Sequence, residues 1–191
     1  RYYIPDIDTT DKAAITVEEI LAHQSGLSPW IGFYQSTLPT EKTKVYNPIY
    51  YSTTLKDEFR IPIAENMFLR ADYIDTIFQK IWDSSLRASK TYKYSDIGFM
   101  ILQKIIQYQG KRTLDVYAEN NFYKPLGLRH TTFNPLLNIP KSNIVPAEVD
   151  KYWRNQTING VVHDRAAAML GGVAVHAGLF STSYDMAVLM Q

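Results

Sequence analysis

Three polar side chains, Tyr94, Ser95 and Asp96, stand directly in front of a strongly apolar run. A tyrosine hydroxyl held near a lysine ammonium is a better proton acceptor, because the positive charge stabilises the phenolate. A carboxyl group two residues further along would project beside that hydroxyl and could bond a substrate. The same tripeptide also has a purely structural interpretation, since Ser or Asp commonly caps an apolar helix. From these three residues alone, capping is the stronger interpretation.

His163, Asp164 and His176 are the second group that could do chemistry. Two imidazoles and a carboxylate could ligate a metal, but their spacing matches no H-x-x-x-H pattern on a helix. The surrounding Ala and Gly residues favour tight packing, so structural histidines bonded to the backbone are expected. Neither a metal nor a cofactor is therefore predicted. His176 also begins an H-x-G triplet, but a helix follows too soon for a substrate-binding strand.

No serine in the chain has the surroundings of a nucleophile. Ser25 lacks the glycine two residues before it that a G-x-S-x-G elbow needs, because His23 stands there. No lysine follows a serine at the spacing of a Ser-x-x-K pair, and the triplet Lys-Thr-Gly does not occur. There is no cysteine, which excludes thiolate nucleophiles, disulfides and Cys-based zinc sites.

The elements that position these residues are predicted to be mostly helical. The strongest pattern covers residues 96–109, which are apolar nearly all round, as in a buried helix. Thr16 and Glu19 form a capping box at the start of another helix. Residues 28–70 and 134–160 show no clean periodicity and are expected to be ordered loops. The helix that begins at this capping box is expected over 17–24. Apolar spacing predicts further helices over 71–82, 114–123, 163–170 and 183–191, and a short strand over 173–175.

Length and composition describe one globular domain or a large piece of one. The chain has 191 residues, of which 46% are hydrophobic and 20% charged, and its net charge is +1. Lys and Arg are scattered, so a nucleic-acid partner is not expected. No apolar run reaches the roughly 18 residues of a membrane span. The chain stops inside an apolar helical pattern and starts abruptly, so we expect it to be part of a longer protein.

Four segments, taken in order, resemble the serine β-lactamase and penicillin-binding-protein superfamily in its class C-like branch. They span almost the whole chain: ITVEEILAHQSGL (15–27), YKYSDIGFMILQKII (92–106), YKPLGLRHTTF (123–133) and the stretch from GVVHD to AVLMQ (160–191). The last segment resembles most closely those members that are fused to a glycoside hydrolase family 3 β-N-acetylhexosaminidase domain. The resemblance therefore implies an attached glycoside hydrolase domain as a possible partner.

The resemblance assigns roles to two residues. Tyr94 matches the catalytic tyrosine of the family, and Asp96 stands at a substrate-binding position where many members have asparagine. An ionised Asp only accepts hydrogen bonds, so its contact with a substrate amide would differ. The Ser-x-x-K and Lys-Thr-Gly boxes would lie upstream and downstream of this chain. Residues 1–191 would then be a partial β-lactamase-like domain, truncated at both ends, mainly α with a few short strands, forming the helical part of the α/β β-lactamase/transpeptidase-like fold.

The implied function is that of a serine acyl hydrolase, with a D-alanyl peptide of the cell wall, a β-lactam or a small ester as substrate. The implied location is periplasmic or secreted. The fragment alone would be inactive and could self-associate through an apolar face. Two alternatives remain: a non-catalytic module that binds peptidoglycan, and a helical interaction module without cleft chemistry. A buried Tyr94 would favour the interaction module.

Overall fold

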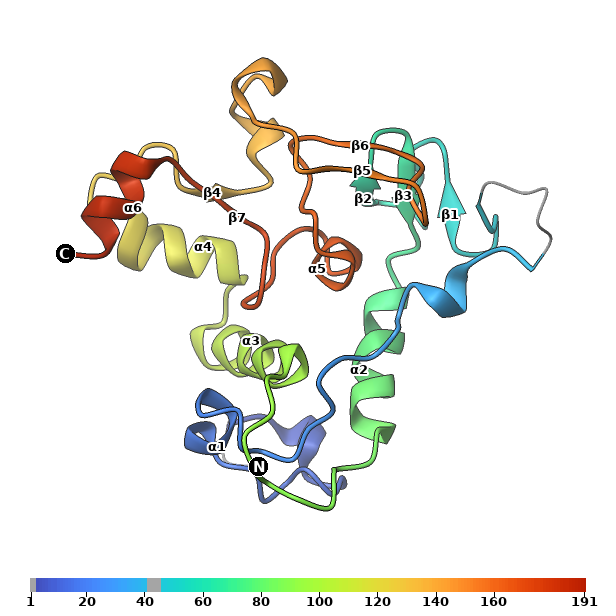
Figure 1. The fold of residues 1–191 in the computed structure, drawn as a ribbon, viewed down its shortest axis with the longest axis vertical. Helices are drawn as coiled ribbons and strands as arrows, with labels where there is room; N and C mark the ends of the chain where they lie inside the picture. The colour runs from blue at the N-terminus through green and yellow to red at the C-terminus, as the bar shows by residue number, and fades with distance from the viewer. Residues whose placement is uncertain (1–2, 41–45) are drawn as a thin grey trace.

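The computed structural model describes residues 3–40 and 46–191. Helix α5 (Arg165–Met169) lies in the middle of the molecule in Figure 1. Around it lie α2 (Tyr73–Asp83), α3 (Asp96–Gly110) and α4 (Leu114–Ala118), which continues as a π-helical turn, and three small sheets. Helix α1 (Val17–Leu21) packs against α3, and α6 (Ser183–Leu189) lies near the C-terminus.

Helix boundaries follow the capping chemistry of the sequence. The predicted capping box is confirmed: Thr16 Oγ1 accepts from Glu19 N–H at 3.1 Å, and Glu19 Oε2 accepts from Thr16 N–H at 2.9 Å. Helix α3 ends at Gly110, and Lys111 beyond it adopts the left-handed conformation with φ 50°.

The strands are the main departure from the sequence prediction. Antiparallel strands β1 (Tyr51–Ser52), β3 (Met67–Leu69) and β2 (Ile61–Ala64) form one sheet in that order. Two further antiparallel pairs join β4 (Thr132–Phe133) to β7 (Leu179–Phe180) and β5 (Glu148–Asp150) to β6 (Gln156–Ile158).

The prediction of a mainly α fold is therefore wrong. About 35% of the residues are helical and 10% lie in strands, so the chain carries small sheets inside both regions expected to be loops. The physical reason is strand length: two to four residues are too few to produce a readable alternation of apolar and polar side chains. The strand predicted over 173–175 is also not observed. These described residues form no strand, and the next strand along the chain is β7.

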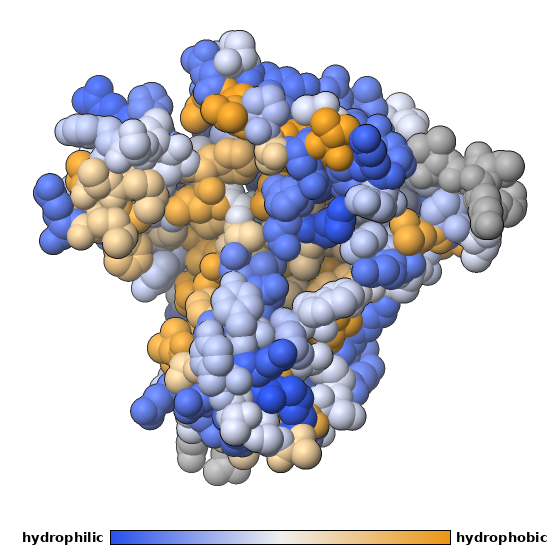
Figure 2. All heavy atoms as spheres, in the orientation of Figure 1, coloured by the Kyte–Doolittle hydropathy of each residue, from blue (hydrophilic) through white to orange (hydrophobic). Residues whose placement is uncertain are grey.

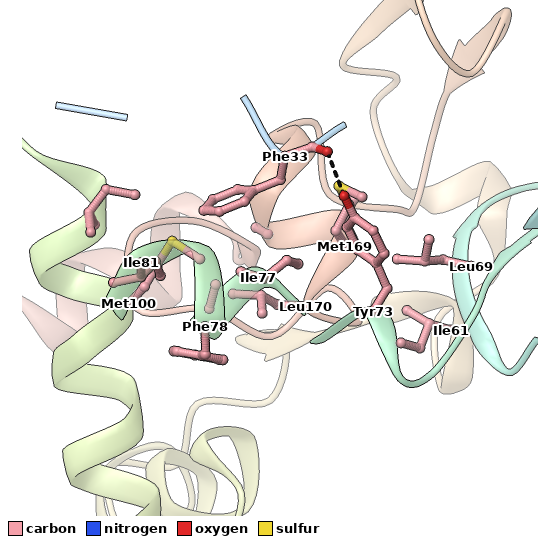
Figure 3. Packing of buried hydrophobic residues seen from close by; sticks show 14 of the residues in the cluster. Phe33, Ile61, Leu69, Tyr73, Ile77, Phe78, Ile81, Met100, Met169 and Leu170 are labelled. Carbon is pink, nitrogen blue, oxygen red and sulfur yellow. Dashed lines mark hydrogen bonds between the residues drawn. The ribbon is translucent and has the colours of Figure 1, made fainter. Parts of the chain in front are cut away.

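The core joins the elements that carry the candidate residues. Figure 3 shows Tyr73, Ile77 and Ile81 of α2 directed toward residues of α3 and of the α5 region. All three are at most 5% exposed. The Tyr73 hydroxyl donates to the Phe33 carbonyl at 3.0 Å, which ties the segment before β1 to α2. This packing places α2 against Met100 of α3 and against Met169 and Leu170 at the end of α5. Among the described residues, no helix has the length and apolar character needed to cross a membrane.

An apolar hollow separates α3 and α4 from the β4–β7 pair. It has a volume of about 400 Å³, and its lining includes Ile106, Leu114, Ala118, Phe133 and Leu179. Figure 2 shows apolar surface in this part of the molecule. We expect the chain, prepared by itself, to associate as its concentration rises, because water-exposed apolar surface favours burial. Light scattering after size-exclusion chromatography measures this, and a monomer at every concentration would contradict it.

Candidate functional site

Ser95 is the residue that caps α3. Its hydroxyl accepts from Gly98 N–H at 3.4 Å and donates to the Ser28 carbonyl at 2.7 Å, and the residue is only 2% exposed. Asp96 is the first residue of the helix, where its negative charge is favoured by the helix dipole. The capping and the site interpretations therefore hold together: Ser95 closes the helix end, and Tyr94 and Asp96 are left to face outward.

Tyr94 lies at the surface and packs on His23. Its side chain is 58% exposed, and its ring centroid lies 4.6 Å from that of His23. His23 has a positive φ of 54°, and its Nδ1 accepts from Ser95 N–H at 3.1 Å. His23, in the turn after α1, thus packs on Tyr94 and also holds the backbone of the next residue, Ser95.

Replacing Ser95 by Ala should destabilise the chain by about 1–2 kcal/mol, the usual effect of losing a helix N-cap. The substitution also leaves the Ser28 carbonyl without its donor. Urea unfolding measures the loss. Thr113→Ala is the matched control, because Thr113 occupies the N-cap of α4 without a side-chain capping bond. Equal losses in both variants would contradict the role of the Ser95 hydroxyl.

A cleft of about 340 Å³ opens beside Asp96. Its walls come from three parts of the chain: residues 30–35, the first turns of α3, and residues 163–166 at the start of α5. The structure therefore brings Asp96 and Asp164 into one cleft although they are far apart in sequence. Tyr94 does not line the cavity itself, but it lies close enough to respond to both carboxylates.

The pKa of Tyr94 is raised above its ordinary value. The negative charge of Asp96 is the main cause, and desolvation and the more distant Asp164 act in the same direction. The phenol is thus held in its protonated form by the residues of this chain. A role as proton acceptor would require a cation placed near the hydroxyl, which would lower the pKa.

The candidate histidines bond to carboxylates, which corrects the expectation of backbone partners. His176 Nε2 lies 3.1 Å from Asp164 Oδ1, and His163 Nε2 lies 3.1 Å from Glu148 Oε2. Burial alone would raise the pKa of Asp164, but His176 and the N–H of Ala167 outweigh it and lower the pKa. No group of three or more possible ligands for a metal occurs within the residues that the structure describes.

A buried ion pair holds the wall that contains His163 and Asp164. Arg154 Nε lies 3.0 Å from Asp150 Oδ2, and both side chains are fully buried. The same guanidinium donates to the carbonyls of Val162 at 2.8 Å and His163 at 2.6 Å. Arg154 therefore anchors the segment just before α5 through its backbone.

Sequence reasoning did not find Trp30 and Arg165. Both line the cleft, and Trp30 is 62% exposed. The guanidinium of Arg165 lies 5.0 Å from the centre of the Tyr34 ring. The segment around Trp30 has no periodicity, so its only sequence signal is a tryptophan three residues after the HQSGL segment. Arg165 directly follows His163 and Asp164, but no pattern in the sequence distinguishes it from an ordinary surface charge.

Comparison with known proteins identifies the family of this chain. A model of the Beta-lactamase family matches residues 1–191. The chain belongs to the Beta-lactamase family. An N-acetylmuramyl-L-alanine amidase of Bacillus subtilis is 33% identical in an alignment of 192 residues. The alignment covers 94% of this chain and 38% of the relative. A protein of Salmonella paratyphi B named "Putative D-alanyl-D-alanine carboxypeptidase" is 44% identical over 110 residues, covering 51% of this chain and 26% of that protein.

Solved structures agree with this membership at the level of the fold. The octameric penicillin-binding protein homologue of Pyrococcus abyssi superposes with a TM-score of 0.55 at 16% identity, covering 99% of this chain and 36% of that one. The Beta-lactamase family chain described here thus spans well under half the length of each of these relatives.

Proposed function

We propose that this chain is the tyrosine-bearing part of a serine acyl hydrolase that works through an acyl-enzyme. The observation that carries the proposal is the placement of Tyr94: exposed, packed on His23, and next to a cleft that Asp96 lines. The serine and lysine of the Ser-x-x-K box would come from the rest of the protein, as would the Lys-Thr-Gly box. The class C-like branch and the attached glycoside hydrolase domain belong to the same proposal.

The proposed chemistry runs in two steps. A serine oxygen attacks the substrate carbonyl, its proton passes through the Tyr94–lysine pair to the leaving group, and an ester to the serine forms. Water then attacks that ester, and the same pair takes a proton from the water and gives it to the serine oxygen as the acyl group leaves as the acid. Backbone N–H groups would stabilise the oxyanion in both steps. The lysine ammonium would also offset Asp96 and Asp164 and so bring the Tyr94 pKa down.

A D-alanyl peptide of the cell wall, a β-lactam or a small ester fits this chemistry as substrate. The names of the Bacillus and Salmonella relatives support the cell-wall class. A periplasmic or secreted location would follow, since peptidoglycan lies outside the cytoplasmic membrane.

Intact mass spectrometry after incubation with a penicillin and, separately, with a fluorophosphonate tests this proposal. The full-length protein should gain one adduct on the serine of its Ser-x-x-K box. The 191-residue chain by itself should gain none, because it lacks that serine–lysine pair. An adduct on the isolated chain would overturn the assignment of the nucleophile, and no adduct on the full-length protein would argue for a binding role.

A non-catalytic peptidoglycan-binding protein is the second candidate. Asp96, where many family members have asparagine, favours it, because an ionised carboxylate cannot donate to a substrate carbonyl. The third interpretation, an interaction module without cleft chemistry, would be favoured by a buried Tyr94, but this side chain is 58% exposed.

A further inference from the structure

We propose that Asp96 makes the cleft selective for acyl donors that carry a positively charged ammonium group on the acyl side, an inference that rests on the proposed function. Asp96 would act as a specificity-determining residue. The chemical class is an amino acid or peptide derivative with a free amine, as opposed to its neutral N-acylated analogue.

The first step of the argument is the balance of charge in the cleft. Its lining includes four residues with a carboxyl, imidazole or guanidinium side chain, and three of them already lie near a group of opposite charge type. His163 lies 3.1 Å from Glu148, Asp164 lies 3.1 Å from His176, and Arg165 lies 3.6 Å from the buried Asp150. In the described parts of the chain, no ion pair joins Asp96 to a cation. The carboxylate that remains to be balanced in the cleft is therefore that of Asp96.

The second step is an aromatic residue in the wall of the same cleft. Trp30 lines the same cavity and is 62% exposed, so much of its indole surface is accessible. An aromatic face attracts an ammonium group through its quadrupole. A carboxylate and an exposed aromatic ring in one half-enclosed space together favour a cation, and both disfavour a substrate carboxylate at that position.

The third step is size and position. A cavity of about 340 Å³ holds an amino acid side chain or a short N-terminal residue. Asp96 lies two residues from Tyr94 and dominates the electrostatic surroundings of its hydroxyl. A substrate ammonium bound at Asp96 would therefore lie next to the reacting bond. Binding it would also offset the charge that opposes ionisation of Tyr94, which couples recognition of the amine to catalysis.

The ammonium group has two possible sources, and paired substrates distinguish them. The first pair is D-alanine p-nitroanilide and its N-acetyl derivative, which differ only in the α-ammonium group. The second pair is Nα-acetyl-L-lysyl-D-alanyl-D-alanine and its Nα,Nε-diacetyl derivative, which differ only in the side-chain ammonium. Hydrolysis by the full-length protein should favour the charged member of one pair by about tenfold or more in kcat/KM, because a partly desolvated charge pair contributes at least that much to discrimination.

Asp96→Asn should reduce this preference to within about threefold, since the amide keeps the size of the side chain and removes its charge. Asp57→Asn is the control: Asp57 is an exposed loop residue outside the cleft, so it makes the same change in net charge and should leave the ratio unchanged. Equal turnover of both members of both pairs, or a preference that survives in Asp96→Asn, overturns the inference and leaves the proposed function standing.

Absence of turnover on all four compounds would instead count against the proposed function. Titration calorimetry of the same four compounds with the full-length protein then decides the inference alone. Binding of the charged member about tenfold tighter, lost in Asp96→Asn, supports selectivity for the ammonium group. Equal affinities within each pair overturn it.

Discussion

Replacing Tyr94 by Phe in the full-length protein is expected to lower kcat/KM for a β-lactam or D-alanyl substrate by about 10²- to 10⁴-fold, the range in which positioned proton transfer contributes. The substitution removes the hydroxyl and keeps the ring, so packing on His23 is retained. Stability should hardly change, because the side chain is 58% exposed. A steady-state assay with a chromogenic β-lactam or D-alanyl ester measures the effect.

Tyr92→Phe provides the matched control for this experiment. Tyr92 is 66% exposed, precedes Tyr94 by two residues and also contacts the ring of His23, with centroids 5.9 Å apart. The proposed mechanism gives Tyr92 no part in proton transfer, so the loss of its hydroxyl should change turnover less than about threefold. Unchanged turnover in Tyr94→Phe would remove Tyr94 from the mechanism, and equal losses in both variants would assign the effect to the His23 contact.

The sequence predicted the helices well because their signals are local. The T-x-x-E box marked the start of α1, and the apolar run after Asp96 marked α3 within a residue. The capping function expected at residues 94–96 is present at Ser95, directly before α3. These features depend on hydrogen bonds and side-chain spacing inside one segment, which the sequence states directly.

The sheets and the wall of the cleft could not be predicted from local sequence signals. Strand β3 pairs with both β1 and β2, and each of these strands has only two to four residues. Asp164 enters the cleft because Arg154 bonds to the backbone just before it, which is a contact between side chain and carbonyl with no sequence pattern. The segment of Trp30 is held at the cleft by the core packing of Phe33 and by the Pro29 carbonyl, which accepts from Asp96 N–H at 3.1 Å. Such placements are set by tertiary contacts.

Arg154→Ala should produce the largest loss of stability among these substitutions, about 3–5 kcal/mol, the range seen when one partner of a buried ion pair is removed. It leaves the fully buried Asp150 carboxylate with only the Arg165 guanidinium, 3.6 Å away, as a cation. The carbonyls of Val162 and His163 also lose their donors. Since the free energy of unfolding of a protein is about 5–15 kcal/mol in total, this loss would remove a large part of it. Urea unfolding followed by the fluorescence of buried Trp153 measures the change.

The pH dependence of stability provides a second readout of the same pair. Burial alone would raise the pKa of Asp150, but the N–H groups of Tyr152 and Trp153 and the Arg154 guanidinium lower it to about 2. The unfolded chain therefore binds this proton more readily, so the contribution is complete above the ordinary carboxyl pKa and is lost as the pH falls toward 2. In Arg154→Ala the pKa of Asp150 rises, and this acid-sensitive part of the stability should shrink.

Arg70→Ala is the control for both readouts, because it breaks an ion pair of similar chemistry at the surface. Arg70 lies 2.5 Å from Asp72, and the two side chains are 39% and 62% exposed. Water already solvates both charges, so the loss should be far smaller than in Arg154→Ala. A similar loss in the two variants would mean that the buried pair does not anchor the wall. A large loss in Arg154→Ala alone, with weaker binding in the cleft, would link this anchor to the position of Asp164 and so to recognition beside Asp96.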